Sequence, residues 1–232
     1  MNRASELDLQ IKTSFSFDLD PQSEDGKEAT LLASLVRNLN QAGHNPATSG
    51  NYSLRSVSRP GYCLISESGI DKSIFSEDNL LYVNKNNGEV DAMFRKMGRR
   101  ASDETQIHLA IFRSTSANCV LHSHLLESLL FADLFPRQNT IFVEGLELLK
   151  GLSGIRTHLT KIPIPCFENS QDIRLLANEI ENTLRSSLNI YGILLRGHGV
   201  YVWGESVQDA KRHLEVFNYI FKYFLQSQRR PT

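Results

Sequence analysis

Two histidines, His122 and His124, follow the apolar run 119–121 and are separated by one residue. Because alternate residues of an extended strand point to the same face, their imidazoles can reach one metal ion. A third histidine, His198, stands between two glycines after a second apolar run, 192–195. The pattern predicts two buried strands whose ends converge on a three-nitrogen metal site.

Three protein ligands with one open position are typical of a catalytic zinc rather than a structural one. The alternative interpretation is that these are three unrelated polar residues at strand ends. Nitrogen ligands also suit iron, nickel or copper, so the residue types alone leave the metal open. We expect the other histidines to be structural, and these are His44, His108, His158 and His213.

Apolar residues recur at helical spacing in several segments, with short apolar runs between them. Helices are predicted over 27–43, after Ser102, over 125–130, 142–152, 172–185 and 210–224. Strands are predicted over 52–57, 61–65, 80–83, 119–121, 192–195 and 200–203, with an extended segment at 162–165. Asn87 and Gly88 predict a hairpin turn before residues 89–93.

The predicted strands are short and linked by turns, with too few helical crossovers for a fully parallel sheet. We therefore expect the α/β fold class, with one domain over 27–232 that has a mostly antiparallel central sheet flanked by helices. Residues 1–26 are polar and are predicted to form a loosely ordered N-terminal arm. Phe15 and Phe17 alternate within it, which is compatible with a short edge strand.

Charge and cysteine content limit the class of partner. The formal net charge of -1 gives no basic excess for nucleic-acid binding. The small basic cluster at 95–100 is expected to be a solvated loop, with binding of an anionic small substrate as the second interpretation. The three cysteines lack paired spacing, which predicts reduced thiols. With no apolar targeting segment and no run of membrane-spanning length, we expect a cytoplasmic protein without membrane contact.

Three segments offer hydroxyls and glycines that suit an anion. They are 47–51, 66–69 and the helix start at Ser102, where free N–H groups and the helix dipole favour phosphate. Each one alone is more simply explained as a turn or a helix cap. Taken together they suggest an anion cradle.

These segments resemble, in order and approximate spacing, the class II aldolase/adducin family over about residues 27–226. The matching motifs are 46–51, 68–69, 102–105, 122–124 and 196–199. Three further stretches, 147–151, 163–169 and 198–204, are more similar to the family's dehydratases than to its sugar-phosphate aldolases. The resemblance implies a three-layer α/β/α fold, a sugar-phosphate substrate, one zinc ion per subunit, and a homotetramer with sites near the subunit contacts.

The resemblance also implies roles for individual residues. His122, His124 and His198 match the zinc ligands, and Glu147 matches an acid/base of the dehydratases. Glu104 matches the catalytic carboxylate of the aldolases, although an acid at a helix start has an equally good structural explanation. The positions that match phosphate contacts are Gly50, Asn51, Ser68, Gly69 and Ser102.

One segment departs from the family pattern, because Ile70 and Ser73 stand where a basic residue and a glycine are expected. The metal motif does not discriminate dehydration from aldol cleavage or epimerisation of a sugar phosphate. A non-catalytic interaction module of the adducin type is the third alternative. That class of protein is expected to lack the metal ligands, and all three are present here.

Overall fold

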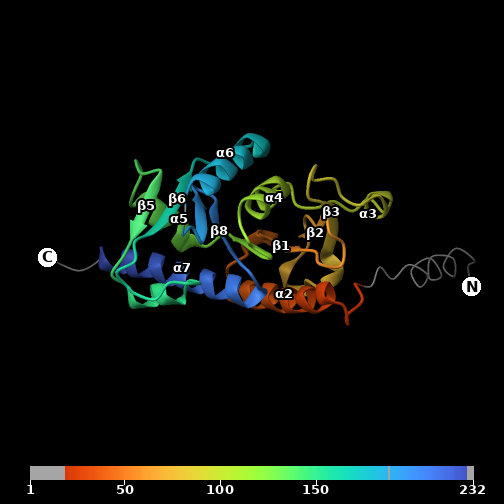
Figure 1. Cartoon of the computed structure of the whole chain (residues 1–232), viewed down its shortest axis with the longest axis horizontal. Helices are drawn as coiled ribbons and strands as arrows, with labels where there is room; N and C mark the ends of the chain where they lie inside the picture. Colours follow the sequence, from red (N-terminus) through yellow and green to blue (C-terminus); the bar gives the residue numbers. More distant parts are fainter. Residues whose placement is uncertain (1–18, 188, 229–232) are drawn as a thin grey trace, which may run out of the picture.

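The computed structural model describes residues 19–187 and 189–228, which form a single mixed sheet with helices on both faces (Figure 1). Within these residues the sheet has the order β3-β2-β1-β4-β8-β7-β6-β5. Its strands are β1 Asn51–Arg55, β2 Tyr62–Ser66, β3 Leu80–Asn84, β4 Cys119–Ser123, β5 Thr140–Val143, β6 Ile162–Phe167, β7 Gly192–Leu195 and β8 Gly199–Gly204. Only the β6–β7 pair is parallel, so the mostly antiparallel sheet is confirmed.

Helices cover the sheet in two layers (Figure 1). The α-helices are α2 Glu24–Gln41, α3 Ala92–Lys96, α4 Thr105–Ser114, α5 Leu126–Asp133, α6 Ile173–Ser186 and α7 Val207–Ser227. Short 3-10 helices are η1 Pro46–Thr48, η2 Lys72–Ile74, η3 Glu77–Asn79 and η4 Glu147–Gly151. Apolar side chains of α2, α5 and α7 pack on one face, and those of α4 and α6 pack on the other. The result is three layers, α/β/α.

The alternation of side chains along β4 places the candidate ligands on a defined face. Cys119 and Leu121 belong to the core beneath α2, α5 and α7, whereas Val120 belongs to the core beneath α4 and α6. His122 follows in register and therefore lies on the same face as Val120. On the neighbouring strand β8, Tyr201 lies on that face as well and pairs with His122.

Polar caps explain where the long helices begin. The hydroxyl of Ser23 accepts a hydrogen bond of 3.0 Å from the amide of Gly26, so α2 begins at Glu24, earlier than the predicted Lys27. Asp172 and Ser206 cap α6 and α7 in the same way. The predicted strand containing Phe15 and Phe17 lies outside the described residues. No helix of the described chain has both the length and the apolar character needed to cross a bilayer.

One local prediction is wrong, and a second is confirmed only in part. The helical spacing over 142–152 is split between β5 and η4, because Gly145 adopts a φ of +83° between them and Phe142 and Val143 pair with β6. Asn87 and Gly88 do form a turn. After it, the chain pairs with β3 at a single antiparallel bridge, between Val83 and Val90. Asp91 then caps α3, so residues 89–93 do not form a strand.

Candidate metal centre

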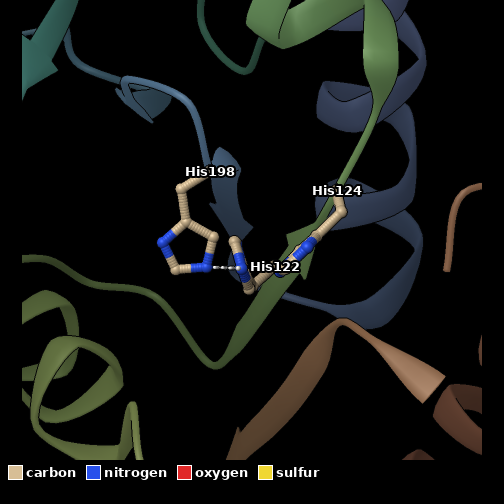
Figure 2. Close-up of side chains that lie close together, drawn as sticks. All are labelled: His122, His124 and His198. Carbon is tan, nitrogen blue, oxygen red and sulfur yellow. Dashed lines mark hydrogen bonds between the residues drawn. The ribbon is translucent and has the colours of Figure 1, made fainter. Parts of the chain in front are cut away.

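His122, His124 and His198 converge in space (Figure 2). His122 is on β4, His124 follows the end of that strand, and His198 lies in the loop between β7 and β8. One ligand nitrogen from each imidazole can be chosen so that all three lie within 4.8 Å of one another. The convergence expected from the sequence is thus confirmed.

The pairing of β4 with β8 explains why residues so distant in sequence meet. His122 is opposite Tyr201, and the turn that carries His198 leads directly into β8. Gly199 is required at the start of β8, because a Cβ there would collide with the carbonyl of Ser123 and lie 3.1 Å from the His122 ring. Arg196 holds the turn by donating hydrogen bonds to three carbonyl groups at the end of α5 and beyond it.

Hydrogen bonds orient two of the rings so that their Nε2 atoms face each other. The Nδ1 of His122 lies 3.0 Å from the carbonyl of Val200 and must donate, since a carbonyl only accepts. The Nδ1 of His198 likewise pairs with the Oδ1 of Asn169 at 3.2 Å. The two Nε2 atoms are 3.3 Å apart (Figure 2). Such outer contacts are what a metal-binding imidazole requires to hold its tautomer.

The protonation state of the histidines also suits a metal. Burial lowers the pKa of His122 to about 3, and burial together with the neighbouring His198 lowers the pKa of His124. Both imidazoles are therefore neutral at physiological pH and offer lone pairs. Three imidazole nitrogens that converge on one point fit a divalent transition metal.

Glu104, which immediately precedes α4, joins this group. Its Oε1 lies 2.9 Å from the Nε2 of His198, and its Oε2 lies 3.4 Å from the Nε2 of His122. The hydroxyl of Tyr201 donates to Oε2 at 2.5 Å, and the Nδ2 of Asn51 donates to the same oxygen at 2.7 Å. Burial alone would raise the pKa of Glu104, but the contacts with His198, His122 and Tyr201 hold it well below its usual range. The carboxylate is therefore ionised beside the three imidazoles.

A buried histidine supports this carboxylate from behind. The Nε2 of His108 donates to the Oδ1 of Asn51, and its Nδ1 accepts from the hydroxyl of Ser53 at 2.7 Å. The amide nitrogen of Asn51 in turn donates a hydrogen bond to Glu104, so the orientation of Asn51 also orients the carboxylate. His108 is thus structural, as expected, and it determines how Asn51 presents its amide group.

The five positions predicted to contact phosphate line one pocket of about 320 Å³. They are Gly50, Asn51, Ser68, Gly69 and Ser102. Gly50 is needed for the shape of this pocket, since its φ of +80° favours glycine and a Cβ would lie 2.7 Å from the Oδ1 of Asn45. Glu104 and His124 also line the pocket, so it reaches the metal-ligand candidates.

A second pocket, of about 810 Å³, begins at the same place. It shares Glu104 and His124 with the first pocket and is also lined by His198. Its apolar lining comes from Leu126 and Leu129 at α5 and from Ile173 at α6. A polar pocket and a partly apolar pocket therefore meet at Glu104 and His124.

Glu147 lies elsewhere in the chain. Its side chain is 71% exposed, its Oε1 is 2.5 Å from the Nζ of Lys150, and it lines neither pocket. The contact with Lys150 lowers the pKa of Glu147, whereas an acid catalyst near neutral pH needs a raised pKa. Within one chain the structure does not bring Glu147 to the histidines.

Sequence reasoning missed three residues of the site. Tyr201 lies in the stretch 198–204 that resembles the dehydratases, but its contact with Glu104 depends on the register of β8. Asn169 lies in the similar stretch 163–169, and it orients His198. Lys72 lines the polar pocket. In the sequence it was visible only as a basic residue between Ile70 and Ser73, the two positions that depart from the family pattern.

Comparison with known proteins agrees with this geometry. The family described as "Class II Aldolase and Adducin N-terminal domain" matches residues 30–225 of the chain. The methylthioribulose-1-phosphate dehydratase of Stenotrophomonas maltophilia (strain K279a) is 37% identical over 207 residues, which cover 88% of this chain and 92% of that protein. The protein of the same name from Yersinia enterocolitica serotype O:8 / biotype 1B (strain NCTC 13174 / 8081) is 39% identical over 189 residues, which cover 81% and 86%.

A solved structure supports the fold. The crystal structure of l-fuculose-1-phosphate aldolase from Thermus thermophilus matches with a TM-score of 0.66 and 20% sequence identity. The match covers 88% of this chain and 96% of that one. At this identity the similarity shows a shared architecture and nothing finer.

Proposed function

The chain belongs to the class II aldolase and adducin family, and from this premise we propose that it is a metal-dependent dehydratase of 5-methylthioribulose 1-phosphate in methionine salvage. The product would be 2,3-diketo-5-methylthiopentyl 1-phosphate. The names of the relatives in Stenotrophomonas and Yersinia support this substrate, because each aligns with most of this chain.

The observation that carries the proposal is that two pockets with different lining residues meet at Glu104 and His124. The proposed substrate has a phosphate at one end and a methylthio group at the other, with a ketone and two hydroxyls between. The hydroxyl-lined pocket suits the phosphate, and the lining of Leu126, Leu129 and Ile173 suits the methylthio end. The reacting carbons would then lie beside His124 and Glu104.

Dehydration removes a proton from C3 and hydroxide from C4, which leaves as water. The resulting enol gains a proton at C4 and becomes the second ketone. His122, His124 and His198 would hold a divalent metal, which would supply Lewis-acid stabilisation of negative charge on the substrate oxygens. We propose zinc, because three protein nitrogen ligands with an open position are typical of catalytic zinc sites.

Two carboxylates are proposed to move the protons. Glu104 lies beside His122 and His198, where it is proposed to accept the proton from C3. Glu147 is proposed to protonate the C4 oxygen. Because Glu147 is exposed and outside the pockets of its own chain, this role requires that it reach the site of a neighbouring subunit. There a drier environment would raise its pKa.

Assembly and location follow from the same proposal. A homotetramer would supply the neighbouring Glu147, and a small sugar phosphate would be the only partner besides the other subunits. We propose a cytoplasmic location, which agrees with three cysteines that are buried and free.

Turnover of a substrate panel tests the function. Methylthioribulose 1-phosphate, fuculose 1-phosphate and ribulose 5-phosphate are supplied separately to the zinc-loaded protein, and the products are identified by mass spectrometry. We expect loss of water from the first and little change in the others. Cleavage to dihydroxyacetone phosphate, or epimerisation, would contradict dehydration and indicate an aldolase or an epimerase.

A further inference from the structure

A buried lysine lines the polar pocket. Lys72 begins η2 and is only 2% exposed, which is rare for a lysine. Its ammonium donates to the carbonyl of Thr48 at 3.0 Å and to the carbonyl of Ile70 at 2.9 Å. Both acceptors are neutral, so the positive charge is hydrogen-bonded but not compensated by them.

No carboxylate among the described residues lies within 4.0 Å of this ammonium. The acids around it have other partners. Glu67 pairs with Arg99 at 2.6 Å, and the carboxylate of Asp71 accepts from the amide of Ser73 at 2.8 Å, so the adjacent Asp71 attracts the ammonium without an ion-pair contact. Burying a charge without a counter-charge is costly, so such a group points to an anion that arrives from outside.

The loop opposite Lys72 has features of a binding loop. Ala47 and Thr48 adopt left-handed φ values of 52° and 64°, which are strained for residues other than glycine. The hydroxyl of Ser49 is buried there and has no hydrogen-bond partner. Backbone strain and an unsatisfied hydroxyl both cost free energy, and contacts with a bound ligand can offset that cost. The bond from Lys72 to Thr48 holds this loop at the pocket.

We infer that Lys72 provides the positive charge that binds the substrate phosphate in this pocket. The inference rests on the proposed function for the identity of the phosphate ester, and it adds a residue to the five positions that resemblance supplied. A phosphate oxygen would give the Lys72 ammonium a negatively charged acceptor, whereas the two carbonyl groups are neutral.

The competing explanation is that Lys72 only tethers the loop at Thr48. The two explanations differ in what a neutral side chain of equal length would change. A tether alone predicts that any fall in phosphate affinity is matched by a fall in stability. A phosphate ligand predicts a selective loss of that affinity.

The test compares Lys72→Met with Lys72→Arg and with the matched control Lys211→Met, which removes an exposed lysine of α7. Binding of inorganic phosphate to each zinc-loaded protein is measured by calorimetry, and unfolding by thermal denaturation. We expect Lys72→Met to bind phosphate roughly 10- to 100-fold more weakly, as for loss of a charge-assisted hydrogen bond. Lys72→Arg should retain part of the affinity, and Lys211→Met should match the wild type.

Equal phosphate affinity in a folded Lys72→Met variant would overturn the inference. If that variant does not fold, Lys72→Arg is compared with Lys211→Met. Lys72→Arg should then bind phosphate several-fold more weakly, and equal affinity of the two variants would be contradictory. Binding of inorganic phosphate does not require catalysis. The role of Lys72 can therefore be tested even if the protein shows no dehydratase activity.

Discussion

The imidazole of His122 stacks on the phenol ring of Tyr201, with ring centroids 4.0 Å apart and an interplanar angle of 15°. The two residues are opposite each other in β4 and β8. The same tyrosine donates its hydroxyl to Glu104. One side chain therefore orients a metal-ligand candidate through its ring and the neighbouring carboxylate through its oxygen.

Replacing Tyr201 by phenylalanine separates these two roles. The ring stack on His122 remains, while the hydrogen bond to Glu104 is lost. We expect zinc content to stay at the wild-type level and kcat to fall roughly 10- to 100-fold, since a bond to a charged group contributes about 1.5–3 kcal/mol. Tyr201→Leu, which also removes the stack, should lower zinc content. An unchanged kcat in Tyr201→Phe would exclude this role for the hydroxyl.

His108 should make stability depend on acidity. Burial lowers its pKa from the usual 6.5 to about 4, so the unfolded chain binds a proton more readily than the folded one. This contribution is complete above pH 6.5 and is lost as the pH falls toward 4. The free energy of unfolding should decrease by on the order of 3 kcal/mol from this residue alone.

Urea unfolding of the wild type and of His108→Gln, each at neutral pH and at about pH 4, isolates that contribution. Other buried histidines contribute equally to both proteins, so only the difference between them is informative. The variant should lose less stability on acidification than the wild type does. Equal losses would mean that His108 does not titrate as its burial requires.

Glu147→Gln tests the proposed acid. The side chain is 71% exposed and pairs only with Lys150 and His158 among the described residues, so the change should leave fold and zinc content intact. We expect most of the turnover to be lost, because an amide cannot donate a proton to the C4 oxygen. Glu215→Gln, an exposed glutamate of α7 that is 64% exposed, is the matched control and should stay active. Full activity of Glu147→Gln would remove this residue from the reaction.

Leu126→Ser tests the apolar pocket. Leu126 is 65% exposed and lines that pocket, so truncation should change stability little. If the methylthio group packs there, the variant loses apolar contact with the substrate. Each lost contact the size of one CH₂ group costs about 0.8 kcal/mol, so kcat/KM for the methylthio substrate should fall roughly fourfold for each. Leu130→Ser on the same helix, at a side chain that is 42% exposed, does not touch the pocket and is the control. Equal effects of both variants would argue against this placement.

The sequence predicted the parts of the molecule that depend on local patterns. The alternation at His122 and His124 and the turn at His198 were sufficient to predict the cluster, because each signal lies within a few residues. The mostly antiparallel sheet followed from short strands and tight turns. Helices with a clear apolar stripe and a polar cap, such as α6 and α7, were also predictable.

Contacts between distant segments were not predictable in the same way. Tyr201 reaches Glu104 and His108 reaches Asn51 only because the register of separate strands and the position of α4 bring them together. The error over 142–152 has a similar origin, since the apolar residues there face the core from a strand and then from a short 3-10 helix. Spacing alone does not distinguish that arrangement from one helix.

The central claim is that three imidazoles hold one catalytic metal ion, and elemental analysis tests it most directly. The wild type and His198→Ala are purified without chelator and analysed together with their turnover of methylthioribulose 1-phosphate. We predict close to one zinc per chain in the active wild type, and little zinc and little activity in the variant. A variant that retains full zinc, or a fully active wild type without bound metal, would contradict the claim.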